Sequence, residues 1–205
     1  MASTARQPQR RAPRREQILE AARERFAANG IGAVTMGDIA STAGVSPGNL
    51  YYWFRQKSDV VNALFDEWSR ASQPAVSPAD PPHEVLAFLW ERESLQQRVT
   101  AHYDFFARDL LPLLHSDPDL RDRYRANYQA GMAGLHALFR RVIDAGLLRD
   151  DVDVDSLLRV GWMASEIGGP WTEIVDPDGD PVRHTRALMS LALTPSGRAS
   201  LESHT

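Results

Sequence analysis

The sequence has no cysteine and no long apolar run, and each absence excludes a class of protein. Without cysteine, neither a disulfide framework nor a thiolate zinc site can form. The longest uninterrupted apolar run is Val85 to Trp90, whereas a membrane span needs about 20 apolar residues. Nothing near the N-terminus resembles the apolar segment of a signal peptide. We therefore expect a cytoplasmic protein with no membrane partner.

The net charge of −4 is unevenly distributed. Residues 1–71 hold 10 Arg and Lys against 7 Asp and Glu, and residues 72–205 hold 13 against 20. A basic end joined to an acidic remainder indicates that one part of the chain contacts phosphate. Residues 1–13 are expected to form a disordered basic tail, which either adds contacts to DNA or only keeps the protein soluble.

Apolar residues recur at helical spacing along most of the chain, and no segment alternates as a strand does, so we predict an all-α fold. Four prolines between Gln73 and Pro82 mark a linker and a domain boundary. Ser58 is expected to cap the fourth helix, and Pro112 and Pro170 to end the fifth and seventh. The expected helices span 14–29, 36–43, 47–54, 58–72, 83–111 as one helix or two, 118–145, 153–168 and 181–194.

Residues 35–57 have the pattern of a helix-turn-helix. Thr35 and Asp38 are spaced as a capping box for a first short helix, and Gly44 can supply the left-handed turn that ends it. Ser46 can cap a second helix whose first residue is Pro47. Two helices joined by so short a turn cross steeply, as in a DNA-binding helix-turn-helix.

These residues closely resemble the DNA-binding domain of the TetR/AcrR family of transcription regulators, over about residues 14–70. The matching positions are Thr35, Ile39-Ala40, Ala43-Gly44-Val45-Ser46, Gly48, Leu50-Tyr51, Phe54 and Lys57. The resemblance implies an N-terminal three-helix DNA-binding domain (14–72, with a linking helix 58–72) and a C-terminal helical domain (73–205) for effector binding and dimerisation. It also implies a sequence-specific regulator, a repressor that a small-molecule effector releases from its operator.

The resemblance places the helix from Pro47 to Phe54 in the major groove of double-stranded DNA, and chemistry then suggests the role of each side chain. Trp53 either donates its indole N–H or only packs. The groups expected at phosphate belong to Thr35, Ser46, Tyr51 and Lys57. The groups expected at base edges and thymine methyls belong to Pro47, Gly48, Asn49 and Tyr52.

Two other motifs point to different chemistry, and both fail on mechanism. Residues 44–48 match the G-x-S-x-G nucleophile elbow, but that elbow follows a strand, and Pro47 has no N–H to donate to an oxyanion. Residues 176–180 resemble a calcium loop, but Pro181 stands at its sixth position and Ala187 where the ligating glutamate belongs. We expect no catalytic residue, no metal site and no cofactor.

Aromatic residues on the C-terminal helices could surround an effector, although such residues more often form core. The candidates are Trp90, His102, Phe105, Phe106, Tyr128, Met132 and Trp162. His102, on an apolar stripe, is either a ligand contact or a core histidine. A protein that binds an effector but has lost DNA recognition is the second functional hypothesis, which a gel shift would separate from the first.

The helix that begins near Asp153 is apolar around most of its circumference, so it must be buried on several sides. We predict that it forms a homodimer interface together with the 181–193 helix; the alternative is an internal core helix. Two recognition helices about one DNA turn apart, ~34 Å, would then contact a palindromic operator.

Overall fold

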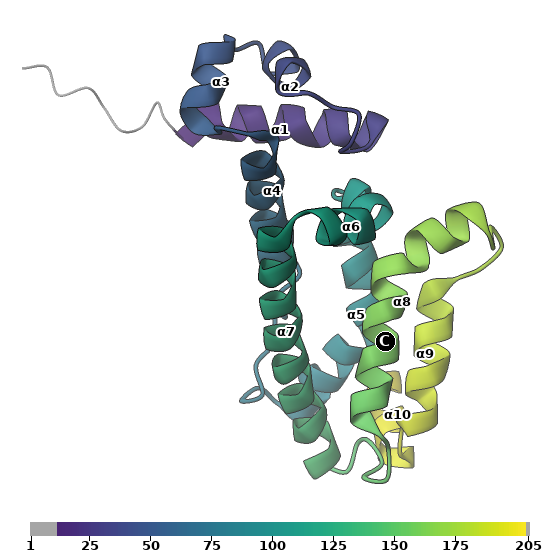
Figure 1. Ribbon diagram of the computed structural model, residues 1–205. Coiled ribbons are helices and arrows are strands. Elements are labelled where there is room, and N and C mark those ends of the chain that lie inside the picture. The colour runs from purple at the N-terminus through teal and green to yellow at the C-terminus, as the bar shows by residue number, and fades with distance from the viewer. Residues whose placement is uncertain (1–11, 204–205) are drawn as a thin grey trace, which may run out of the picture. The chain divides into compact units, whose positions relative to one another are not determined.

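The computed structural model describes residues 12–203, so almost all of the predicted basic tail, 1–13, lies outside the described residues. Within them the chain forms helices joined by turns, with one isolated bridge between Leu148 and Leu193. The helices belong to two compact units, the first ending at Arg70 and the second beginning at Ala71 (Figure 1). The predicted all-α fold is confirmed.

The first unit has a core formed by short helices. It contains α1 (Ala12–Asn29), α2 (Met36–Thr42), α3 (Pro47–Trp53) and nearly all of α4 (Lys57–Ala71). α1 buries Ile18, Leu19 and Phe26 on the face that the sequence predicts. It ends where Gly30 adopts a φ of 77°, a conformation that glycine reaches without a steric penalty.

α4 begins one residue earlier than the sequence indicates. Its first residue is Lys57, so Ser58 lies inside the first turn, and the prediction that Ser58 caps the helix was wrong. The Asp59 carboxylate accepts hydrogen bonds from the backbone N–H groups of Arg55 and Gln56, at 2.8 and 3.1 Å. An acid in the first turn therefore satisfies the amides at the helix start.

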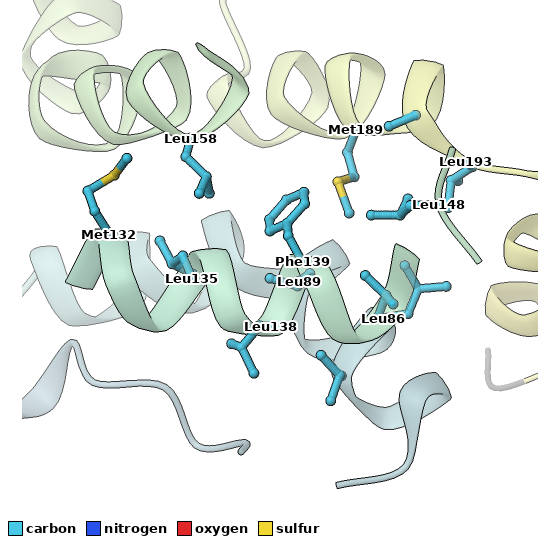
Figure 2. Close-up of a cluster of buried hydrophobic side chains, with 13 residues drawn as sticks. Leu86, Leu89, Met132, Leu135, Leu138, Phe139, Leu148, Leu158, Met189 and Leu193 are labelled. Carbon is cyan, nitrogen blue, oxygen red and sulfur yellow. The ribbon is translucent and has the colours of Figure 1, made fainter. Parts of the chain in front are cut away.

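The second unit consists of helices and the turns between them. It contains α5 (Pro82–Thr100), α6 (Asp104–Ser116), α7 (Pro118–Asp144), α8 (Val154–Ile174), α9 (Pro181–Ala192) and α10 (Pro195–Glu202). α5 and α8 contact α7, and α9 contacts α8 and α5 (Figure 1). Leu135 and Phe139 of α7 face Leu158 of α8 and Met189 of α9, as Figure 2 shows. Each such buried side chain contributes ~1.5–3 kcal/mol.

The predicted stripe from Leu95 to Leu110 is divided between two helices. α5 ends at Thr100, and the next three N–H groups bond back to carbonyls of α5 in a turn. α6 then runs through Pro112, so the prediction that this proline ends the helix was wrong. The burial of Phe105, Phe106 and Leu110 outweighs the ~3 kcal/mol that an interior proline costs.

Two further helix ends differ from the prediction. α8 continues through Gly168, Gly169 and Pro170 to Ile174, and the Thr172 hydroxyl donates to the Gly168 and Gly169 carbonyls. α10 was not predicted. It begins after Thr194, whose hydroxyl accepts a hydrogen bond from the Gly197 N–H at 3.1 Å. Both differences arise because side-chain hydroxyls satisfy backbone groups at positions where the sequence indicates only an end.

Two kinds of feature are absent from residues 12–203. None of the helices there is both long and apolar enough to cross a membrane. In the same residues, the 176–180 loop included, no group of three or more His, Asp or Glu side chains could hold a metal ion.

Candidate DNA-binding surface and effector cavities

The first helix of the motif is held by a complete capping box. The Thr35 hydroxyl accepts from the Asp38 N–H at 3.2 Å, and the Asp38 carboxylate accepts from the Thr35 N–H at 2.8 Å. The Thr35 hydroxyl also donates to this carboxylate, at 2.7 Å, and these bonds hold the pKa of Asp38 below its ordinary value. The start of α2 is therefore fixed, and the hydrogen atom of the Thr35 hydroxyl is already donated within the chain.

The turn between α2 and α3 depends on Gly44, which has a φ of 61°. The N–H of Val45 bonds to the Ala40 carbonyl and that of Gly44 to the Ser41 carbonyl, at 3.0 and 3.1 Å, which is a Schellman ending. From α1, the Gln17 amide donates to the Ala43 carbonyl at 2.9 Å. These bonds fix the angle at which α3 leaves α2.

α3 buries one side and exposes the other. Leu50 is fully buried and anchors the helix, while Tyr51 and Tyr52 are 52% and 63% exposed. The N-terminal residues Pro47, Gly48 and Asn49 are exposed as well. Around Gly48 there is open space even where a Cβ would stand. The exposed side of α3 therefore carries five of the predicted DNA contacts.

Two predicted contacts at the ends of α3 have partners within the chain. The Ser46 hydroxyl accepts a hydrogen bond from the Asn49 N–H at 3.3 Å, as predicted for a cap. Trp53 is half-buried and lies edge-on to Tyr52, with ring centroids 5.4 Å apart. A packing role for Trp53, which holds the Tyr52 ring, agrees with this geometry.

Lys57 lies on backbone carbonyls. Its Nζ donates to the carbonyls of Ile31, Gly32 and Val34, at 2.8, 3.2 and 2.9 Å. An ammonium group has three N–H donors, so all of them are used in the loop between α1 and α2. The sequence predicts that Lys57 contacts phosphate. In the structure its side chain is not extended toward a phosphate, because its ammonium group is bonded to these three carbonyls.

None of the three cavities described below is lined by more than one of the predicted effector residues. Phe105 and Phe106 are fully buried, with ring centroids 4.8 Å apart. His102 is exposed in the turn after α5, so its predicted place on an apolar stripe was wrong, because the helix ends before it. Tyr128, Met132 and Trp162 pack in the core of the second unit, and only Trp90 among the candidates lines one of the cavities described next.

Two cavities share one residue, Glu93. A cavity of about 70 Å³ between α5, α8 and α9 is lined by Trp90, Arg92 and Glu93, among others. A larger one, of about 240 Å³, lies between α5, α6 and α8, and its lining includes Glu93 and Ser165. A third hollow, of about 430 Å³, is an open groove lined by α7 and Pro78. The first two reach into the second unit and are the candidate effector sites.

Buried charged groups lie beside these cavities. Burial raises the pKa of Glu93 and lowers that of Arg92. Burial also raises the pKa of Glu166 to about 7, although hydrogen bonds from Tyr124 and Trp162 and the charge of Arg92 act to lower it. This cluster was not predicted from the sequence. The sequence does contain a signal for it: Glu166 is an acidic residue on a helix that is apolar around most of its circumference, which indicates a buried carboxylate.

An apolar surface covers neighbouring faces of α8 and α9. Met163, Ile167 and Trp171 of α8 are 58%, 49% and 55% exposed, and Leu191 of α9 is 69% exposed. Val160, Ile174 and Leu188 extend the same kind of surface. The opposite side of α8 faces inward, where Leu158 is buried. Large exposed apolar patches of this kind are typical of protein interfaces.

Comparison with known proteins identifies both units. Residues 18–64 match the family model described as bacterial regulatory proteins of the tetR family, and residues 73–167 match one described as bacterial transcriptional repressor. The chain is 33% identical over 160 residues to the transcriptional repressor KstR2 of Mycolicibacterium smegmatis, covering 74% of this chain and 76% of that protein.

Two more matches agree with this identification. The transcriptional regulator TtgR of Pseudomonas putida is 39% identical over 71 residues, which are 35% of this chain and 34% of TtgR. The crystal structure of a TetR-family regulator from Marinobacter aquaeolei VT8 superimposes with a TM-score of 0.76 at 26% identity, over 92% of this chain and 95% of that one. Together with the helix-turn-helix geometry, these matches confirm the resemblance seen in the sequence: the chain belongs to the TetR family and is a DNA-binding regulator of transcription.

Proposed function

We propose that the chain is a homodimeric repressor that binds a palindromic operator through α3 and is released by a small-molecule effector bound in the second unit. DNA binding is its activity, with no catalytic step, and it acts in the cytoplasm, where the DNA lies. The observation that carries the proposal is the exposed side of α3, which presents two tyrosines and an asparagine on a helix anchored by a fully buried Leu50.

The side chains of α3 divide into two groups by chemistry. Asn49 can form a bidentate pair with adenine, and the Tyr52 ring and Pro47 can contact thymine methyls, so we assign them to base recognition. Gly48 lets the DNA approach the backbone closely. Ser46 and Tyr51 have hydroxyl groups that suit phosphate, and Thr35 contributes through the amides at the start of α2. The Trp53 ring packs edge-on against the Tyr52 ring and holds it in position.

The exposed apolar face of α8 and α9 supports dimerisation. An interface between two identical chains related by a twofold axis is isologous, which means that one self-complementary patch serves both. The residues exposed on α8 recur at Met163, Ile167, Trp171 and Ile174, which is one face of a helix. This repeat agrees with the prediction that α8 pairs with a second copy, and α9 adds Leu191 to the same patch.

Repression and release are supported by the matched repressors and by the cavities. A ligand that binds better to the state with low DNA affinity shifts the population toward that state. The cavity of about 240 Å³ is large enough for a small molecule, and its residues differ from those predicted in the sequence. Of the predicted effector contacts we retain Trp90 at the smaller cavity, and we assign Tyr128, Met132 and Trp162 to the core beside it. Phe105 and Phe106 are buried outside that core cluster.

Selection of DNA fragments from a random pool, followed by sequencing, tests the proposal. The purified chain should retain fragments that share a palindromic motif. The Asn49→Ala variant should lose preference at one base pair in each half-site and bind the motif with about 5- to 150-fold lower affinity for each half-site, since a good bidentate pair contributes ~1–3 kcal/mol. Its binding to unrelated DNA should not change.

Gln129→Ala is the matched control, because it removes an exposed amide from α7 in the second unit. It should select the same motif as the unchanged protein. Retained fragments without a shared motif at moderate salt would contradict the proposal, as would an Asn49→Ala variant that selects the unchanged motif.

A further inference from the structure

The cavity of about 240 Å³ between α5, α6 and α8 has an acidic lining. Glu93 lies at its buried end, 6% exposed, whereas Asp104 and Glu173 are exposed. Arg108 is the one basic residue of the lining, and its guanidinium forms an ion pair with Asp104 at 3.4 Å. The lining therefore holds three carboxylates against one cation, and that cation is paired.

The Glu93 carboxylate has room for another partner. Its Oε2 accepts a hydrogen bond from the Ser165 hydroxyl at 2.8 Å, and no other residue among 12–203 donates a hydrogen bond to it. An ionised carboxylate has about four acceptor positions on its two oxygens. The buried carboxylate that lines this cavity thus keeps acceptor positions for a further partner.

The nearest buried charges do not balance the acids. Arg92 is close enough to Glu93 and Glu166 for its charge to act on both, so above the pKa of Glu166, about 7, two carboxylates share one guanidinium. That guanidinium lies over the Trp162 ring, 5.9 Å from its centroid, and Arg92 lines the smaller cavity. A buried carboxylate without a full countercharge raises the free energy of the folded state. A cationic ligand would supply the missing positive charge, whereas an anionic ligand would add to the repulsion between the carboxylates.

The apolar part of the lining limits the shape of the ligand. It consists of Ala101, Ala107, Gly169 and Pro170, with no aromatic ring on which a flat ligand could stack. A water molecule occupies about 30 Å³ in the liquid, so the cavity corresponds to on the order of eight waters. A linear aliphatic chain fits this volume and lining better than a flat ring system.

We infer that this cavity binds a small aliphatic amine, with the ammonium group held by the Glu93 carboxylate and the chain directed toward Asp104 and Glu173. The inference rests on the proposed function, since it names the chemical class of the effector. Ser165 acts as a positioning residue, because its hydroxyl holds the Glu93 carboxylate in place.

Calorimetric titration with three probes of equal chain length tests the inference. The probes are the diamine putrescine, the neutral butanediol and the anionic succinate. Putrescine should bind the full chain with a dissociation constant at or below about 1 mM, whereas the other two should show no binding. The Glu93→Gln variant keeps the size of the side chain and should bind putrescine at least about tenfold more weakly, because it loses a charge-assisted hydrogen bond.

The control variant is Glu202→Gln, which removes an exposed carboxylate from α10 and should bind putrescine as the unchanged protein does. The comparison of probes on the unchanged protein does not depend on whether Glu93→Gln folds. Binding of succinate or butanediol in place of putrescine, or equal binding of putrescine by Glu93→Gln, would overturn the inference. These titrations contain no DNA, so a chain that selects an operator but binds no amine would leave the proposed function standing.

Discussion

At the scale of single residues, Lys57 has an unusual position. It is the only lysine in the chain, and its ammonium group lies on three carbonyls of the loop that leads into α2. A compact ammonium group can bond three converging carbonyls, whereas the planar guanidinium of arginine cannot. Lys57 is therefore a positioning residue, which orders the loop that precedes Thr35 and through it the start of α2.

Lys57→Arg separates positioning from direct phosphate contact. If Lys57 orders the loop, the variant should lose ~1–3 kcal/mol of unfolding free energy, because three carbonyls lose their donor, and should bind the operator more weakly. The slope of log affinity against log salt should stay unchanged, measured by fluorescence anisotropy. Lys57→Met should also keep the slope, whereas loss of a phosphate contact would reduce its magnitude by about 1.

Glu166 predicts a dependence of stability on pH. Because burial raises its pKa from 4.5 to about 7, the folded chain keeps a proton that the unfolded chain has already released between those values. The free energy of unfolding should therefore fall as pH rises from about 5 to 7 and level off above 7, with a contribution from Glu166 of ~3 kcal/mol.

Urea denaturation at pH 5 and pH 7 checks this contribution. Glu166→Gln should reduce the difference in unfolding free energy between the two pH values, and Glu202→Gln, an exposed acid, should leave it as it is. A Glu166→Gln variant with the same difference as the unchanged chain would show that the carboxyl is ionised in the folded state throughout this range.

At the scale of helices, α8 has two different faces. The inward side carries Leu158, and Ser165 reaches Glu93 of α5, whereas the outward side exposes Met163, Ile167 and Trp171. In the sequence, the helix is apolar around most of its circumference, and this pattern predicts burial on several sides. Under the proposed function, a second chain buries the outward side, and this is why the exposed face and the dimer prediction belong together.

Ile167→Glu should separate the dimer. It places a charge in the proposed interface twice, once from each chain, and removes two buried apolar side chains, so dimerisation should weaken at least about a hundredfold. Sedimentation velocity would then show monomer at concentrations where the unchanged chain is a dimer. Leu111→Glu introduces the same charge at an exposed leucine of α6 and should remain dimeric. Equal sedimentation of the two variants would place the interface elsewhere.

The helix-turn-helix could be predicted from sequence because its determinants are local. Thr35 and Asp38 are three residues apart, and Gly44 ends α2 through its own backbone conformation. The Glu93–Ser165 hydrogen bond could not be predicted from sequence, because it joins residues 72 positions apart whose contact depends on packing between α5 and α8. The path of α6 through Pro112 is also a result of packing, since local propensity favours an end at this proline.

At the scale of the whole molecule, the uneven distribution of charge follows the two proposed roles, DNA binding and effector binding. The basic first third of the chain contains the helix-turn-helix, and the acidic remainder contains the cavities and the apolar face of α8 and α9. Under the proposed function the two activities are coupled, and the coupling is reciprocal: an effector that weakens operator binding is itself bound more weakly by the operator complex, and by the same factor.

Methylation footprinting with dimethyl sulfate on a selected fragment tests the central claim most directly. The reagent modifies guanine N7 in the major groove and adenine N3 in the minor groove, so it reports which groove the protein covers. If α3 of each chain contacts the major groove, guanine N7 should be protected in two patches about 10 base pairs apart, and these patches should disappear with Ile167→Glu. Protection confined to adenine N3, or a single patch that survives this substitution, would contradict the account.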